Sequence, residues 1–189
     1  MNDRNLILVA EDNRDDMFLL RWAFTRAGLA PEIIHMPDGE ATLDYLKGTP
    51  PFDDRALHPL PELLLLDIKM PKANGFDVLA WLATRPDLSW LPVVVFSASV
   101  FPAEVQRAIE LGAREFLTKP SALDELVLLV RRLHDRWLTG NRPGLPPFDF
   151  VHPGSSQPSE AACLLGQGTS GLEGRKGNLA APSDQERLG

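Results

Sequence analysis

Five side chains that could bind a cation and a phosphate follow short apolar runs in this 189-residue chain. Three are acids, one is a hydroxyl and one is an amine: Glu11, Asp12, Asp67, Ser97 and Lys119. In a parallel sheet with helices on both faces, ligands bind beyond the carboxyl ends of the strands. If the apolar runs are such strands, we expect these five groups to converge at one edge of the sheet.

The three carboxylates predict a bound cation. Two carboxylates about 4 Å apart repel by roughly 4 kcal/mol at an effective dielectric constant near 20, so three do not stay ionised together without a counter-charge. Hard oxygen ligands at an open edge favour Mg²⁺, which keeps several waters and leaves positions for a phosphate oxygen. Lys119 would add a second positive charge, and Ser97 a hydrogen bond to that phosphate.

The loop after the first run excludes two common nucleotide sites. A dinucleotide-binding protein carries G-x-G-x-x-G here, and a P-loop enzyme carries G-x-x-x-x-G-K-[ST]. This chain has Glu11-Asp12-Asn13 and no glycine. Nucleotide binding in either mode is therefore not expected.

The elements that must position these groups alternate between apolar runs and amphipathic stretches, which is typical of a parallel sheet between two helical layers. We expect a doubly wound α/β fold with five strands, at about 5–10, 32–36, 63–67, 93–97 and 115–118. Five helices fit at about 14–27, 38–47, 75–84, 103–111 and 122–138. Ser121 with Asp124 resembles a capping box, and Leu123 begins the apolar stripe of the last helix. The connection 48–61, with four prolines, is either a functional loop or a tolerated insertion.

Composition limits the function classes. The net charge of −7 argues against nucleic acid and anionic membranes as primary partners. The single cysteine excludes a disulfide within the chain. The early apolar run is too short for a signal peptide, and no apolar stretch could span a bilayer, so we expect a cytoplasmic protein. Residues 140–189 hold 9 of the 14 glycines, which predicts a mobile, disordered tail after a domain formed by residues 1–139.

Four segments in order resemble the receiver domains of two-component response regulators. They are Leu8 to Asn13, Leu63 to Gly75, Phe96-Ser97-Ala98 and Phe116 to Pro120. The likeness runs from about residue 5 to residue 138. Within the family, the Glu-Asp-Asn start, the long connection before the third strand and Lys119-Pro120-Ser121 are similar to small single-domain receivers paired with phytochrome-type sensor kinases.

The resemblance implies a flavodoxin-like strand order of 2-1-3-4-5 and a role for each site residue. Asp67 would accept a phosphoryl group from a sensor histidine kinase. Glu11, Asp12, Asp67 and the Lys69 backbone carbonyl would hold Mg²⁺. Ser97 and Lys119 would bind the phosphoryl oxygens, and Phe116 would then turn inward. The Lys119–Pro120 peptide bond would be cis. The cis form has a low free-energy cost only when the second residue is proline.

Lys69 also suggests a hypothesis of its own. It lies two residues after Asp67, where its side chain could reach the phosphoryl oxygens or block hydrolytic water. We therefore predict slow self-dephosphorylation.

The interpretation is a phosphorylation switch without an output domain and without enzymatic turnover, which signals through protein contacts. The usual signalling face of receivers comprises the fourth helix, fifth strand and fifth helix. The apolar residues Val100, Phe101 and Leu128 could mark a partner or homodimer surface there.

Two alternatives remain. A phosphatase or phosphotransferase of the haloacid dehalogenase type also uses an Asp nucleophile at a strand end, but it needs a second acid two residues later, where this chain has Lys69. The second alternative is a degenerate receiver, which binds partner proteins without becoming phosphorylated.

Overall fold

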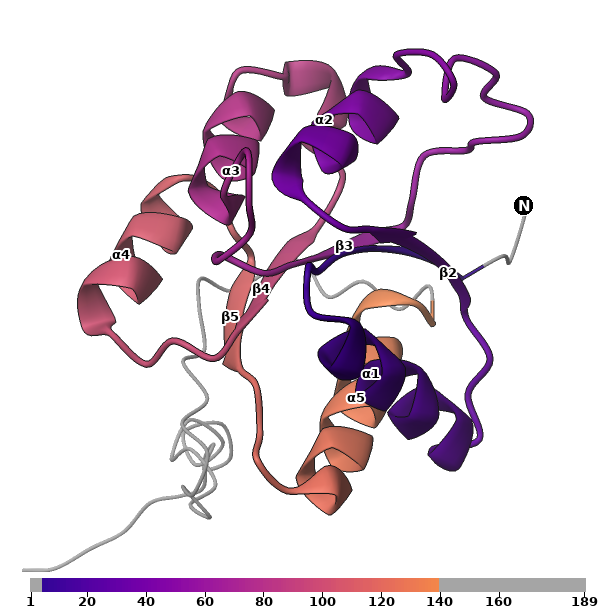
Figure 1. Ribbon diagram of the computed structural model, residues 1–189, viewed down its shortest axis with the longest axis vertical. Coiled ribbons are helices and arrows are strands. Elements are labelled where there is room, and N and C mark those ends of the chain that lie inside the picture. Colours follow the sequence, from indigo (N-terminus) through magenta and orange to yellow (C-terminus); the bar gives the residue numbers. More distant parts are fainter. Residues whose placement is uncertain (1–4, 140–189) are drawn as a thin grey trace, which may run out of the picture. The chain divides into compact units, whose positions relative to one another are not determined.

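The computed structural model describes residues 5–139, which form a five-stranded parallel sheet covered by helices (Figure 1). The predicted tail, residues 140–189, lies outside the described residues. The sheet order β2-β1-β3-β4-β5 confirms the predicted fold and strand order. The strands are β1 (Leu6–Ala10), β2 (Glu32–Met36), β3 (Leu63–Leu66), β4 (Val93–Ser97) and β5 (Glu115–Thr118).

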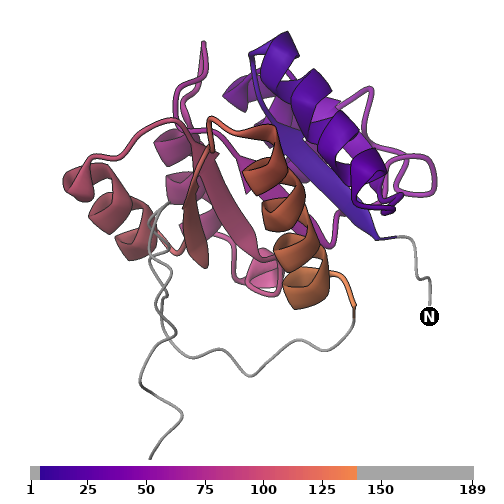
Figure 2. The same cartoon turned by 90° about the horizontal axis from the view of Figure 1, so that it is seen from below.

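The helices form two layers, one on each face of the sheet (Figures 1 and 2). The helices α1 (Arg14–Arg26) and α5 (Leu123–Trp137) cover one face. The opposite face packs against α2 (Gly39–Lys47), α3 (Gly75–Ala83) and α4 (Pro102–Glu110). A short 3₁₀ turn, η1 (Pro86–Leu88), precedes β4.

Alternation along the central strands explains why both faces are apolar. In β1, Ile7 and Val9 belong to the core under α1 and α5, whereas Leu8 and Ala10 belong to the core under the other three helices. Successive side chains of a strand point to opposite faces, so a strand buried on both sides must be apolar throughout. All residues of β1 and β3 are buried. These strands are second and third in the order of five, so their carboxyl ends lie near the middle of the sheet edge.

Helix starts are capped mainly by side chains that precede them. Asn13 accepts hydrogen bonds from the N–H groups of Asp15 and Asp16, and Asn74 forms a capping box with Asp77 at α3. The predicted capping box at Ser121 is wrong. Backbone that is still extended at Ala122 delays the start of α5, and no side chain caps it.

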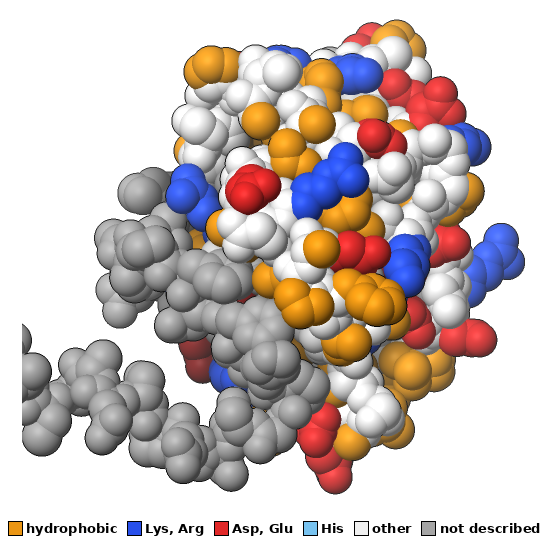
Figure 3. Space-filling view, turned by 90° about the vertical axis from the view of Figure 1, so that its left-hand side faces the viewer, with side chains coloured by type: hydrophobic (Ala, Val, Ile, Leu, Met, Phe, Trp, Pro, Cys, Tyr) orange, Lys and Arg blue, Asp and Glu red, His pale blue; other side chains and the backbone are white. Residues whose placement is uncertain are grey.

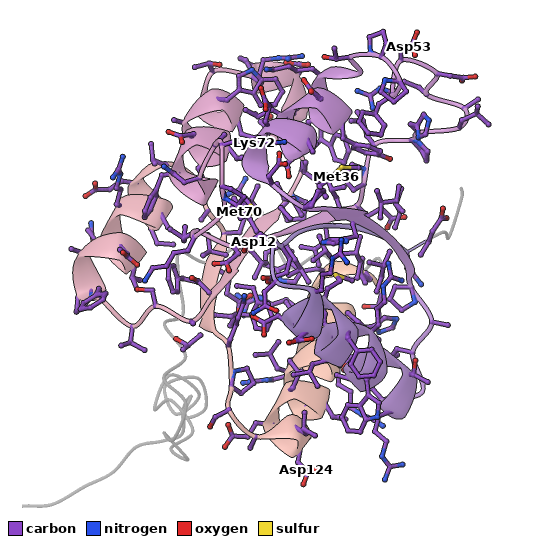
Figure 4. All side chains as sticks on the ribbon, in the orientation of Figure 1. Asp12, Met36, Asp53, Met70, Lys72 and Asp124 are labelled. Carbon is purple, nitrogen blue, oxygen red and sulfur yellow. The ribbon has the colours of Figure 1, made fainter. Side chains whose placement is uncertain are left out.

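The apolar stripe of α5 also begins later than predicted. Leu123 is exposed, while Leu126 is the first buried residue of the helix. Asp124, next to Leu123 in the chain, points away from the body of the domain (Figure 4).

The connection between α2 and β3 is anchored rather than loosely attached. Arg55 donates hydrogen bonds to the carbonyls of Tyr45 and Leu46 at the end of α2, at 2.9 and 2.8 Å. The Tyr45 hydroxyl donates to the Pro59 carbonyl at 2.6 Å. The two Arg55 bonds thus hold the connection to carbonyls in the last turn of α2, where helix carbonyls lack partners further along the helix.

Among residues 5–139, no helix is both long enough and apolar enough to cross a lipid bilayer.

Candidate functional site

The structure brings the predicted acids and the lysine together at the carboxyl edge of the sheet. Glu11 and Asp12 follow β1, Asp67 follows β3 and Lys119 follows β5. Glu11, Asp12 and Asp67 each offer a carboxylate oxygen, and these oxygens all lie within 4.8 Å of one another. Figure 4 labels Asp12 at this edge.

Lys119 is the cation at the centre of the site. Its Nζ lies 2.6 Å from Glu11 Oε2, 2.8 Å from Asp67 Oδ2 and 2.8 Å from Asp16 Oδ2. Burial alone would lower the pKa of Lys119, but the hydrogen bonds to Asp16, Asp67 and Glu11 outweigh it and raise that pKa. The ammonium group therefore stays charged at physiological pH.

Glu11 is the most buried acid of the site. Burial raises its pKa above the ordinary value, although the hydrogen bond from Lys119 opposes the shift. Its Oε1 accepts the Asn13 N–H at 3.1 Å, and its carbonyl oxygen lies 2.6 Å from His35 Nε2. Because burial disfavours the ionised carboxylate, a further positive charge beside Glu11 would stabilise that ionised form.

The three clustered carboxylates have the chemistry of a magnesium site. All donors are hard oxygens, and Asp12 is exposed, so waters and a phosphate oxygen could complete the coordination. The Lys69 N–H donates to Asp67 Oδ1 at 3.2 Å, which orients the second oxygen of that carboxylate. The role of the Lys69 carbonyl as a metal ligand stays a prediction.

The loop between β3 and α3 is in close contact with two glycines, Gly39 at the start of α2 and Gly75 at the start of α3. Neither position has room for a side chain. A Cβ on Gly75 would lie 2.4 Å from the Asp67 carbonyl oxygen, and one on Gly39 would lie 2.0 Å from the Ala73 carbonyl oxygen. Backbone atoms cannot move aside cheaply, so both glycines keep α3 and α2 against the loop that carries Asp67.

An ion pair not identified in the sequence also holds this loop. Lys72 has a positive φ of 64°, and its Nζ lies 2.7 Å from Oδ2 of Asp38, the residue that caps α2. A left-handed backbone is unfavourable for lysine, so the conformation depends on such contacts. Figure 4 labels Lys72 beside α2.

Ser97 and Phe116 are both buried. Ser97 ends β4, and its carbonyl accepts the Lys119 N–H at 2.9 Å. Among residues 5–139, its Oγ has no hydrogen-bond partner. Phe116 lies within the core under α2, α3 and α4. The inward turn of its ring on phosphorylation stays a prediction.

The predicted cis bond between Lys119 and Pro120 is wrong. Within residues 5–139 the cis peptide bond is Pro50–Pro51. The trans form of an X-Pro bond is favoured by about 0.5–1 kcal/mol unless local structure overrides it. Here the Lys119 N–H reaches Ser97 and its ammonium reaches the three acids with a trans bond.

Asp16 is a residue of the site that the sequence analysis did not identify. Its position in the first turn of α1 predicts a favourable interaction with the helix dipole and nothing more. In the structure its carboxylate binds Lys119, 103 residues away. The signal available was its closeness to Glu11, because a helix that starts directly after β1 has its first turn at the same sheet edge.

The chain is similar to known response regulators. A family model described as the response regulator receiver domain matches residues 7–131. The probable methanogenesis regulatory protein FilR2 of Methanothrix harundinacea is 34% identical over 143 residues, covering 75% of this chain and 90% of that protein.

Two relatives with solved structures are similar over most of their length. Response regulator Rcp1 of Synechocystis sp. is 32% identical over 137 residues, covering 72% of this chain and 91% of that protein. The structure of its Mn²⁺-bound form covers 72% of this chain and 96% of its own, with a TM-score of 0.64. The response regulator RPA3017, described in red light signalling of R. palustris, is 33% identical with a TM-score of 0.68, covering 76% and 99%.

Proposed function

Because this chain belongs to the receiver-domain family of response regulators, we propose that it is a switch that accepts a phosphoryl group onto Asp67. One observation carries the proposal. The Asp67 carboxylate lies 2.8 Å from the Lys119 ammonium, in the same cluster of oxygens as Glu11 and Asp12. This arrangement supports the proposal, because Asp67 would act as the nucleophile, Lys119 as a fixed cation and the three carboxylates as ligands of the metal.

The chemistry is an in-line phosphoryl transfer from a phosphohistidine. An Asp67 oxygen attacks phosphorus, the phosphorus–nitrogen bond breaks, and the imidazole leaves with its electron pair. Such a reaction depends mainly on positioning and charge neutralisation. Lys119 would bind a phosphoryl oxygen. Mg²⁺, held by Glu11, Asp12, Asp67 and the Lys69 carbonyl, would neutralise the remaining charge on the transferred group.

The buried hydroxyl of Ser97 supports a switching role. Its Oγ makes no hydrogen bond within the described part of the chain, so it can donate one to a new phosphoryl oxygen. The phosphoryl group adds about −1.5 to −2 charges. Driving a two-state equilibrium from 1:99 to 99:1 takes about 5.5 kcal/mol, which contacts from Ser97, Lys119 and the metal could together supply.

The phosphoryl donor would be a sensor histidine kinase in the cytoplasm. The similarity to RPA3017, which acts in red light signalling, favours a kinase of the phytochrome type. The readout would use the face made by α4, β5 and α5, through a partner protein or a second copy of the chain. Figure 3 views the molecule from the side of α4, where hydrophobic side chains gather among charged ones.

Incubation with acetyl phosphate and Mg²⁺, followed by intact mass measurement, tests the proposal. We expect the wild-type chain to gain one phosphoryl group, and Asp67→Asn to gain none. Continuous release of phosphate from varied substrates would instead indicate a phosphatase. No mass gain in the wild-type chain, with bound Mg²⁺ shown by calorimetry, would indicate a binding module and overturn the phosphoacceptor role.

A further inference from the structure

The ammonium group of Lys119 has no donor left for a new partner. An ammonium has three N–H donors. Oxygens of Glu11, Asp16 and Asp67 lie 2.6, 2.8 and 2.8 Å from its Nζ and take all three. A phosphoryl oxygen can therefore gain a full hydrogen bond from Lys119 only when one carboxylate gives up its own.

Differences in burial indicate which carboxylate gives way. The exposed fraction of the side chain is 4% for Glu11, 8% for Asp67 and 34% for Asp16. A buried carboxylate that loses its partner is left without solvation, which is expensive, whereas water can replace the partner of a carboxylate at the rim. Asp16 is thus the acid that releases Lys119 at the lowest cost.

We propose that Asp16 is a positioning residue that holds Lys119 in the unphosphorylated protein and competes with the phosphoryl group for it. The inference rests on the proposed role of Asp67. Asp16 also places a negative charge close to an incoming anionic donor, which opposes binding of that donor. Its two effects have the same sign, so Asp16 raises the donor concentration needed to switch the protein.

Asp15 offers a matched control. It lies in the same first turn of α1, carries the same charge and is exposed. Within the described part of the chain, the ion pairs of Lys119 are with Glu11, Asp16 and Asp67 and none is with Asp15. Asp15→Asn therefore removes the same charge from the same helix turn without touching Lys119.

The first experiment measures the ion pair between Asp16 and Lys119 in the unphosphorylated protein. Nitrogen-15 NMR of the full chain would follow hydrogen exchange at the Lys119 ammonium group, assigned by its loss in Lys119→Arg. We expect Asp16→Asn to speed this exchange by roughly two- to fivefold, the range of a partly exposed ion pair. Asp15→Asn should leave it unchanged. Equal exchange in the two variants would overturn the inference.

The second experiment measures the competition. With saturating Mg²⁺, we expect Asp16→Asn to lower the half-saturating concentration of acetyl phosphate by roughly two- to fivefold, with the dissociation constant for Mg²⁺ changed less than about twofold. Asp15→Asn should match the wild-type chain. Slower phosphorylation in Asp16→Asn, or a weaker affinity for Mg²⁺ that accounts for the change, would overturn the inference.

The two experiments also separate the inference from the proposed function. If the wild-type chain gains no phosphoryl group, the role of Asp67 fails, and competition for Lys119 fails with it. The NMR measurement would still show whether Asp16 anchors Lys119.

Discussion

The Ser97 hydroxyl is buried and has no hydrogen-bond partner among the residues that the structure describes. The effect of its removal on stability can therefore be measured separately from the effect on phosphorylation. Removal of an unsatisfied buried polar group costs little and can stabilise a protein. We expect Ser97→Ala to leave the free energy of unfolding in urea unchanged within about 0.5 kcal/mol, or to raise it. The same substitution should reduce the yield of phosphorylated protein.

Ser99 is the control for this prediction. It is also buried, but its Oγ accepts the Phe101 N–H at 3.3 Å. Ser99→Ala should therefore lower the free energy of unfolding by about 1 kcal/mol. Equal destabilisation by both substitutions would show that Ser97 has a partner in solution.

Lys69 is exposed two residues after Asp67, the proposed phosphoacceptor, and its backbone N–H donates a hydrogen bond to Asp67 Oδ1. If its side chain shields the acyl phosphate from water, Lys69→Ala should shorten the phosphoryl lifetime severalfold without changing the stability of the fold. Decay of the phosphorylated mass with time measures this lifetime. A lifetime equal to that of the wild-type chain would count against the shielding role.

At the scale of the elements, Asp38 links the start of α2 to the loop that follows Asp67. Its carboxylate accepts the Ala41 N–H at 2.8 Å and binds Lys72 Nζ at 2.7 Å. Loss of a helix N-cap costs about 0.5–2 kcal/mol. We expect Asp38→Ala to lower the free energy of unfolding by about 1 kcal/mol at pH 7, measured in urea. Asp38→Asn, which keeps a capping oxygen, should cost less.

This contribution should depend on pH in a defined direction. Burial would raise the pKa of Asp38, but the Ala41 N–H and Lys72 outweigh it and lower that pKa below the ordinary 3.8. A lowered folded-state pKa adds stability that is complete above the unfolded-state value and disappears as pH falls through the folded-state value. The difference between wild-type chain and Asp38→Asn should therefore narrow below about pH 4. A gap that stays constant down to pH 3 would contradict this assignment.

At the scale of the whole molecule, the proposed homodimer surface can be tested by one exposed leucine. Leu128 lies on α5 and is 61% exposed. If phosphorylation drives pairing through α4, β5 and α5, the phosphorylated chain should sediment as a dimer. Leu128→Asp should return it to a monomer, because a buried unpaired charge is costly at an interface.

Leu57 provides the matched control, since it is 72% exposed and lies in the connection between α2 and β3. Leu57→Asp should leave the dimer intact. A phosphorylated chain that sediments as a monomer, or equal effects of the two substitutions, would contradict the surface.

Local signals in the chain were enough to locate most strands and the acids at their ends. The bounds of β2, β4 and β5 agree with the prediction, because each strand is centred on apolar residues and lies between turn or loop residues. Two strands are one residue shorter, since Asn5 has a positive φ of 45° and Asp67 already belongs to the loop after β3. Glu11, Asp12, Asp67 and Lys119 could be recognised because strand ends lie at one edge in any doubly wound sheet.

Contacts between distant segments required the folded chain. The Asp16 carboxylate on Lys119, the Lys72 pair with Asp38, the unpartnered Ser97 hydroxyl and the trans Lys119–Pro120 bond have no local signature. Periodicity and capping residues report which way a side chain faces within its own element. They do not report which atoms of another element lie within hydrogen-bond distance, because that depends on how the elements pack against each other.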